Sequence, residues 1–81
     1  MQLKFDTHFK TTLKRLEENG WEITECAHAN AKWCTKKINE KDIATIYDYQ
    51  DKCLYVAIYD NFADLNFAIA ICEELKKLEV N

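Results

Sequence analysis

The residue types best suited to metal binding or catalysis form one short cluster, Cys26-x-His28-x5-Cys34. Thiolates and imidazoles are ligands of tetrahedral zinc, which takes four such groups in a structural site. Cys53 could be a fourth ligand only if its strand aligned with the cluster, and the spacing matches no common zinc module. We therefore expect no metal and no cofactor, only two half-buried thiols and a histidine in a turn.

Candidates for acid–base or nucleophilic catalysis are few. His8 and His28 could each transfer protons because histidine titrates near neutral pH, and Cys34 with His28 could form a thiol–imidazole pair. The chain has no serine, which excludes a serine triad, and Gly20 is its single glycine, which excludes a glycine-rich phosphate loop. Because no catalytic set is complete, we expect a protein that is not an enzyme.

The charge is unevenly distributed along the chain, whose net charge is −3. Residues 1–41 carry eight basic and six acidic side chains (+2), and residues 42–81 carry three basic and eight acidic side chains (−5). Between positions 42 and 74, Lys52 alone opposes seven acidic residues. Such a half can simply serve solubility, or it can face a basic partner.

Four tyrosines are interleaved with these acidic residues. Carboxylates speed association with surfaces rich in Lys and Arg, whereas tyrosines provide buried contact area that slows dissociation. The residues expected to bind a partner are Asp42, Asp48, Asp51, Asp60, Asp64, Tyr47, Tyr49, Tyr55 and Tyr59.

The apolar pattern near the N-terminus has helical spacing. The residues on this face are Phe5, Phe9, Leu13 and Leu16. Asp6 or Thr7 could cap the start of a helix, and Asn19-Gly20 supplies the left-handed residue that commonly ends one. The pattern predicts a helix over about 6–18.

Strands are expected over 21–26, 33–38, 43–49 and 53–59, and residues 27–31 could be a turn or one turn of helix. The loop between the last two strands decides which side chains are buried. A three-residue loop at 50–52 places an aliphatic set in the core, namely Ala44, Ile46, Leu54, Val56 and Ile58. It places Thr45 and the four tyrosines on the opposite face. A two-residue loop would instead bury Tyr47 and Tyr49, and we favour the first register because it separates aliphatic residues from tyrosines.

A long second helix is expected over about 62–79, with Asp60-Asn61 at its start and Asn61 and Asp64 resembling a capping box. Its stretch 65–72 is so apolar that it must be covered on more than one side. The sheet would cover one side, and the first helix or a second copy of the chain the other. A homodimer through this helix is therefore one expectation.

Together these elements predict one domain, residues 1–81, with an α+β fold. The expected order is helix, a three- to four-stranded antiparallel sheet, and helix, with both helices on one face of the sheet. Apolar residues make up 48% of the chain and charged residues 31%, which excludes disorder. No apolar run could span a bilayer and the N-terminus lacks a signal peptide, so we expect a cytoplasmic protein that does not bind membranes.

The segment Leu16-Glu17-Glu18-Asn19-Gly20-Trp21 resembles the helix-to-strand join of HicA-type toxins, which are small mRNA-cleaving proteins. The resemblance implies a fold like that of double-stranded-RNA-binding domains and a catalytic histidine after the first strand. In that family the histidine follows a Gly-Ser pair, whereas this chain has Ala27-His28-Ala29. A small ribonuclease or RNA-binding module that uses His28 is thus one alternative.

As a short, acidic, cysteine-containing domain, the chain also resembles the small inhibitors that phages encode, including the anti-CRISPR proteins. The resemblance implies a binding protein that occupies a basic, nucleic-acid-binding surface of a larger protein and contacts no nucleic acid itself. If the gene were from a phage, the protein would act in the host cytoplasm. A structural homodimer is the remaining alternative.

Overall fold

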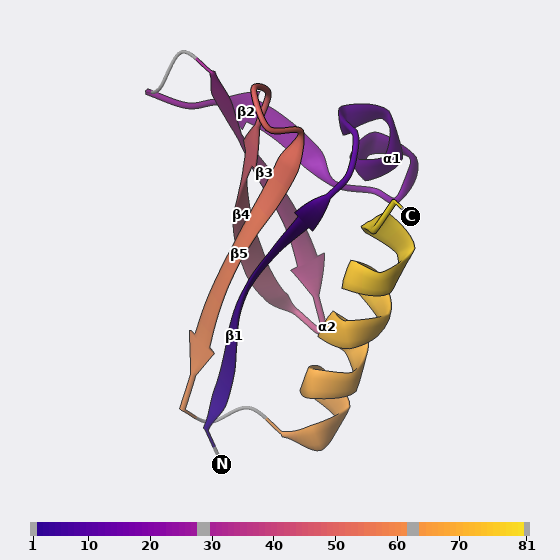
Figure 1. The fold of residues 1–81 in the computed structure, drawn as a ribbon. Helices are drawn as coiled ribbons and strands as arrows, with labels where there is room; N and C mark the ends of the chain where they lie inside the picture. The colour runs from indigo at the N-terminus through magenta and orange to yellow at the C-terminus, as the bar shows by residue number, and fades with distance from the viewer. Residues whose placement is uncertain (1, 28–29, 62–63, 81) are drawn as a thin grey trace.

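The computed structural model describes residues 2–27, 30–61 and 64–80. The strands are β1 (Leu3–Lys10), β2 (Glu22–Glu25), β3 (Ala31–Ile38), β4 (Lys41–Asp48) and β5 (Cys53–Asp60), and the helices are α1 (Leu13–Glu18) and α2 (Leu65–Leu78). The strands form one antiparallel sheet in the order β1-β5-β4-β3-β2 (Figure 1). The α+β class is confirmed, but the sheet has five strands instead of three or four, and the chain begins with a strand.

The expected helix over 6–18 is wrong in its first half. Residues 6–10 belong to β1, where Phe5 and Phe9 pack against the core. Residues four apart share a face in a strand as well as in a helix, because the strand period of two divides four. Pairing of β1 with the distant β5 decides between the two.

Both helices begin later than expected and are capped by other residues. The Thr12 side chain accepts a hydrogen bond from the Arg15 N–H at the start of α1, in place of Asp6 or Thr7. Asn19 is the C-cap and Gly20 has φ +86°, which confirms the expected end. At α2, Asp64 is itself the N-cap, and its Oδ1 accepts from the Phe67 N–H at 2.8 Å. These caps use donors that a helix end leaves free.

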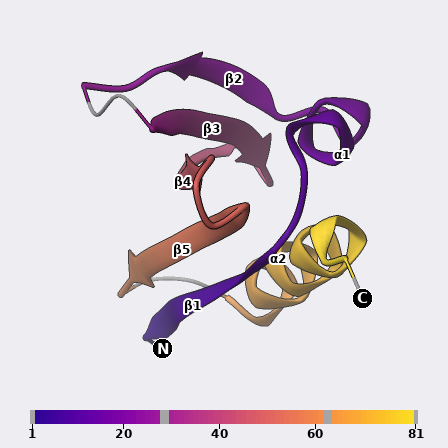
Figure 2. The same cartoon turned by 45° about the horizontal axis from the view of Figure 1, so that its top comes forward.

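One face of the sheet, called here the inner face, carries the core. Both helices lie on this side (Figure 2). Leu16 of α1 and Ile71 of α2 are fully buried with Leu54 of β5. α2 supplies most of the helical contribution through Phe67, Ile71, Leu75 and Leu78. The opposite, outer face carries no helix among the described residues.

The favoured register of the β4–β5 hairpin is wrong. The pairs are Tyr47 with Leu54 and Asp48 with Cys53, so the connection is a four-residue turn, 49–52. Tyr47 therefore lies on the inner face with Leu54 and is buried, while Ile46 and Ala44 lie on the outer face. Asp48 Oδ1 accepts from the Gln50 and Asp51 N–H groups, and Lys52 adopts φ +56°, which together stabilise the longer turn.

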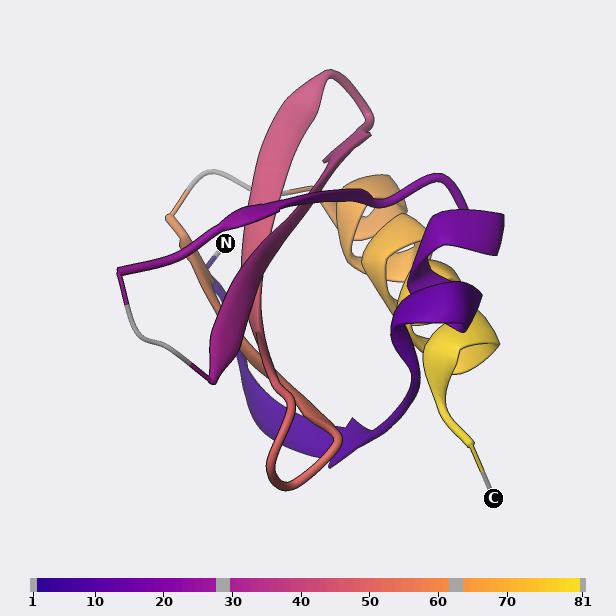
Figure 3. The same ribbon diagram turned by 90° about the horizontal axis from the view of Figure 1, so that it is seen from above.

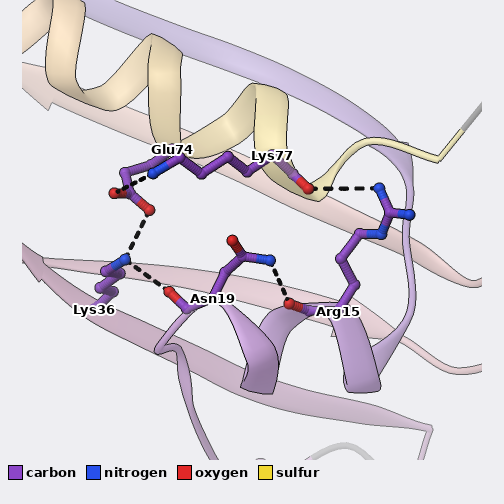
Figure 4. A network of polar contacts seen from close by, with 5 residues as sticks. All are labelled: Arg15, Asn19, Lys36, Glu74 and Lys77. Atoms are coloured by element: carbon purple, nitrogen blue, oxygen red, sulfur yellow. Dashed lines mark hydrogen bonds and ion pairs between the residues drawn. The ribbon is translucent and has the colours of Figure 1, made fainter.

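A polar network joins the two helices to β3 (Figure 4). The Lys36 ammonium donates to the Asn19 carbonyl and to the Glu74 carboxylate, both at 2.7 Å. The Arg15 guanidinium of α1 donates to the Lys77 carbonyl, in the last turn of α2, at 3.5 Å. The short α1 is thus fixed to the C-terminal half of α2, on the inner side of the sheet.

Candidate partner-binding site

A row of side chains crosses all five strands on the outer face, and its members on β1, β5, β4 and β3 are large. Its members are paired neighbours in the order His8, Tyr55, Ile46, Trp33 and Thr24. Tyr55 is 41% exposed and Trp33 39% exposed. Scattered exposed apolar residues are ordinary, but a contiguous row of them on an uncovered face is typical of an interaction surface.

The aromatic residues on β1 and β5 are held in position by their neighbours. The His8 and Tyr55 rings stack with centroids 5.5 Å apart. The Tyr55 hydroxyl donates to Asp51 and the Tyr59 hydroxyl to Asp6, each at 3.3 Å. Partial burial and the Asp51 carboxylate raise the pKa of Tyr55, so its hydroxyl stays protonated and remains a donor.

The β4 and β5 strands separate beyond the row. Their pairing stops at Ile46 and Tyr55, although both strands continue with their other neighbours (Figure 3). Two hollows, of about 360 and 290 Å³, lie along the separation and share Ala44 and Ala57 as lining residues. We call this feature the β4–β5 cleft.

Backbone polar groups also point into the β4–β5 cleft. Two bonds at the strand ends show which residues bond to the outer neighbours of β4 and β5. The Tyr49 N–H donates to the Asn30 carbonyl beside β3, and the Lys52 carbonyl accepts from the Thr11 N–H beside β1. In antiparallel pairs, residues that exchange hydrogen bonds alternate with residues that do not. Even-numbered residues of β4 and odd-numbered residues of β5 therefore direct their N–H and C=O groups at each other across the cleft, where the pairing has ended.

The four expected tyrosines divide between the two faces. Tyr55 and Tyr59 lie on the outer face, and Tyr59 is 59% exposed. Tyr49 lies in the turn, is partly exposed and packs edge-on against Tyr47. Tyr47 itself is buried and donates to the Thr11 carbonyl at 3.1 Å, so it cannot contact a partner. Its assignment as a binding residue is corrected.

The five expected carboxylates do not form one surface. Asp48 and Asp51 lie at the β4–β5 turn, where Asp48 stabilises the turn. Asp42 lies at the far end of β4, and Asp60 there forms an ion pair with Lys41 across the cleft. Asp64 caps α2. Asp51 lies beside Tyr55, and Asp42 lines the same hollow as Tyr59. Neither carboxylate caps a helix.

The cysteines are distributed without a shared site. Cys34 is buried on the inner face and Cys53 is buried on the outer one, while Cys26 is half-buried. Burial raises the pKa of the Cys34 thiol to about 11. Within the described ranges no three His, Cys, Asp or Glu residues are grouped as metal ligands. His28, on which the HicA resemblance and the zinc spacing both depend, lies outside these ranges.

Trp33 and His8 are not among the residues that the sequence predicts to bind a partner. His8 is paired with the exposed Tyr55, and Trp33 is paired with the half-buried Ile46. The alternation of Trp33 with buried Cys34 gave a local signal for an outward position. No comparable signal marks His8, because the apolar spacing around it predicts a helix.

Comparisons with protein-family models, with curated proteins and with solved structures found no match to this chain. Among the described residues, no helix has the length and apolar character needed to cross a membrane.

Proposed function

We propose that this chain is a binding protein that attaches to a basic surface of a larger protein through its outer sheet face. The stacked pair of His8 and Tyr55 carries the proposal, because it lies in one row with Trp33 on a face that no described helix covers. Aromatic residues inside a polar rim are characteristic of protein interfaces. In this proposal the row of aromatic residues forms the centre of the interface, and Asp51 and Asp42 belong to its polar rim.

The β4–β5 cleft is suited to a lysine or arginine side chain of the partner. Asp42 and Tyr59 line its open end on the outer face, whereas the ion pair of Lys41 with Asp60 lies on the inner face. Backbone carbonyls of both strands face the cleft as well. Carboxylates and carbonyls accept from ammonium or guanidinium groups, and aromatic faces attract cations. Lys4 already lies over the Tyr59 ring, with its Nζ 5.7 Å from the centroid, which illustrates the contact.

A protein partner is favoured over direct nucleic-acid binding by charge. The net charge of the chain is −3. The outer face carries four acidic side chains against three basic ones, namely Asp6, Glu22, Asp42 and Asp48 against Lys4, Lys10 and Lys37. Binding of nucleic acid depends on basic side chains that neutralise phosphates. A chain with these charges would instead compete with nucleic acid for a basic surface, which is the action of an inhibitor of the anti-CRISPR or another anti-defence type.

The test uses three immobilised proteins: the natural chain, the double variant Trp33→Ala/Tyr55→Ala, and the control Glu17→Ala on α1. Proteins retained from a host lysate are identified by mass spectrometry, and their binding kinetics are measured with each variant. We expect a basic partner that binds the chain and the control equally. The double variant should dissociate at least ~30-fold faster, since central aromatic residues each contribute about 2 kcal/mol or more.

Asp51→Lys should slow association with the same partner, and this effect should shrink as salt rises. Thermal unfolding verifies that each variant is folded. Equal retention by the double variant and the natural chain would contradict the proposal. So would binding of a single-stranded oligonucleotide that the double variant loses, because the aromatic row would then be a base-stacking platform.

A further inference from the structure

The free edge of β1 presents unused backbone hydrogen-bonding groups. Thr11, which directly follows β1, donates its N–H to the Lys52 carbonyl before β5. Hydrogen-bonded positions alternate along an antiparallel strand, so the other odd-numbered residues of β1 also bond to β5. The N–H and C=O groups of the even-numbered residues therefore point away from β5. The Lys10 carbonyl, which faces away, accepts from the Val80 N–H and confirms this alternation. Within the described residues, Lys4, Asp6 and His8 therefore direct N–H and C=O groups to an edge with no neighbouring strand.

An apolar groove follows this edge on the helix side. A hollow of about 360 Å³ lies between β1 and α2, lined by Phe5, Phe9, Cys72 and Leu75 among others. The adjoining stripe of α2 is exposed, with Leu65 66% and Ile69 47% accessible. Leu65, Ile69 and Cys72 share one helical face. A strand added at the β1 edge would cover part of this apolar surface.

We infer that a second copy of this chain adds its own β1 antiparallel to this edge, forming a symmetric dimer with a continuous ten-stranded sheet. In the proposed register Lys4 is opposite Asp6 of the second copy, and symmetry repeats the pair. Phe5 then meets Phe5 of the second copy beside the α2 stripe. Opposite charges in directly facing positions stabilise strand pairs, and a twofold axis makes such an interface self-complementary.

Charge and the position of Val80 exclude the neighbouring registers. A shift by one step places Asp6 opposite Asp6 of the second copy in one direction and Lys4 opposite Lys4 in the other, and both pairs are repulsive. A further shift in the first direction places Lys4 opposite Lys10, which is also repulsive. That register would also need the Lys10 carbonyl, which Val80 already occupies. The proposed dimer leaves Tyr55 and Trp33 on the outer face of both copies, so it is independent of the proposed function.

The experiment measures dimerisation by sedimentation at high micromolar concentration. We expect the natural chain to be dimeric. Lys4→Asp and Asp6→Lys should each weaken the dimer roughly ten-fold or more, because each places two like-charged pairs at the interface. The double variant Lys4→Asp/Asp6→Lys restores opposite charges and should regain most of the affinity.

Tyr59→Phe is the matched control. It removes the hydrogen bond from Tyr59 to Asp6 within one chain and should leave the dimer unchanged. Circular dichroism verifies the fold of each variant. A monomeric natural chain would overturn the inference, as would a double variant no better than the single ones. Loss of the dimer in Ile69→Asp with no effect of the charge changes would indicate pairing through α2 alone, and would also overturn it.

Discussion

Two tyrosines on neighbouring strands, Tyr47 of β4 and Tyr55 of β5, have opposite surroundings. Tyr47 is 4% exposed on the inner face, and its hydroxyl donates to the Thr11 carbonyl. Tyr55 is 41% exposed on the outer face, stacks on His8, and its hydroxyl donates to Asp51. Both hydroxyls have an acceptor, so the difference is burial, which follows from the face that each position occupies.

This difference separates residues that stabilise the fold from residues available to a partner. The inner face buries its side chains against α1 and α2, so changes there alter the free energy of unfolding. Among the residues that the structure describes, no helix covers the outer face, so changes there should alter binding and leave unfolding nearly unchanged. The following substitutions compare the two faces directly.

Truncation of each tyrosine should give the largest contrast. Tyr47→Ala leaves a cavity beside Leu54 and should lower the free energy of unfolding by about 3–5 kcal/mol. Tyr55→Ala removes a half-exposed ring and should cost no more than about 1 kcal/mol. Urea unfolding followed by fluorescence measures both. Similar losses in the two variants would show that the outer row is part of the core.

The buried thiol of the inner face should make stability depend on alkaline pH. Burial raises the pKa of Cys34 from 9.0 to about 11, so the folded chain keeps a proton that the unfolded chain releases. Its stabilising contribution is complete below pH 9.0 and is lost as the pH rises toward about 11, by at most ~1.4 kcal/mol per pH unit.

The measurement is urea unfolding at several pH values. Cys34→Ala should decrease the loss of stability over this range, whereas Cys72→Ala, at an exposed position of α2, should leave it unchanged. The raised pKa of Tyr47 acts in the same direction and will leave a residual slope in Cys34→Ala. Identical slopes in the two alanine variants would contradict the expectation.

Removal of one hydroxyl should give the smallest contrast. Tyr47→Phe leaves the buried Thr11 carbonyl without this donor and should cost about 1 kcal/mol. Tyr55→Phe frees a solvated carboxylate and should change the free energy of unfolding by less than about 0.5 kcal/mol. Thermal unfolding of the two variants measures this difference in stability. A larger cost in Tyr55→Phe would mean that its bond to Asp51 stabilises the turn.

The sequence predicted α2, the last two strands and the α+β class because each depends on local patterns. The apolar run 65–72 and the β-branched strand β5 are continuous in the sequence. β1 was missed because its neighbour β5 is distant in the chain, and its apolar spacing of four fits a strand as well as a helix.

The candidate site was predicted in part. Tyr55 and Tyr59 were placed on the correct face, but Tyr47 was not, because a turn one residue longer reverses the face of every residue in β4 relative to β5. Asp48 itself was the available signal, because an aspartate at the start of a turn can accept a backbone N–H two residues further on, as it does here from Gln50. The β4–β5 cleft was not predictable, since it arises where pairing between two otherwise regular strands ends.

The pairing of β1 with β5 has a consequence for how the chain folds. The pairs β2–β3, β3–β4 and β4–β5 join segments that are adjacent in sequence, whereas β1 must close a loop that spans all of them, so its closure carries the larger entropic cost. During synthesis β1 leaves the ribosome first and waits unpaired until β5 follows. We expect the meander from β2 to β5 to form early and β1 to be added late, which makes long-range closure the slow step.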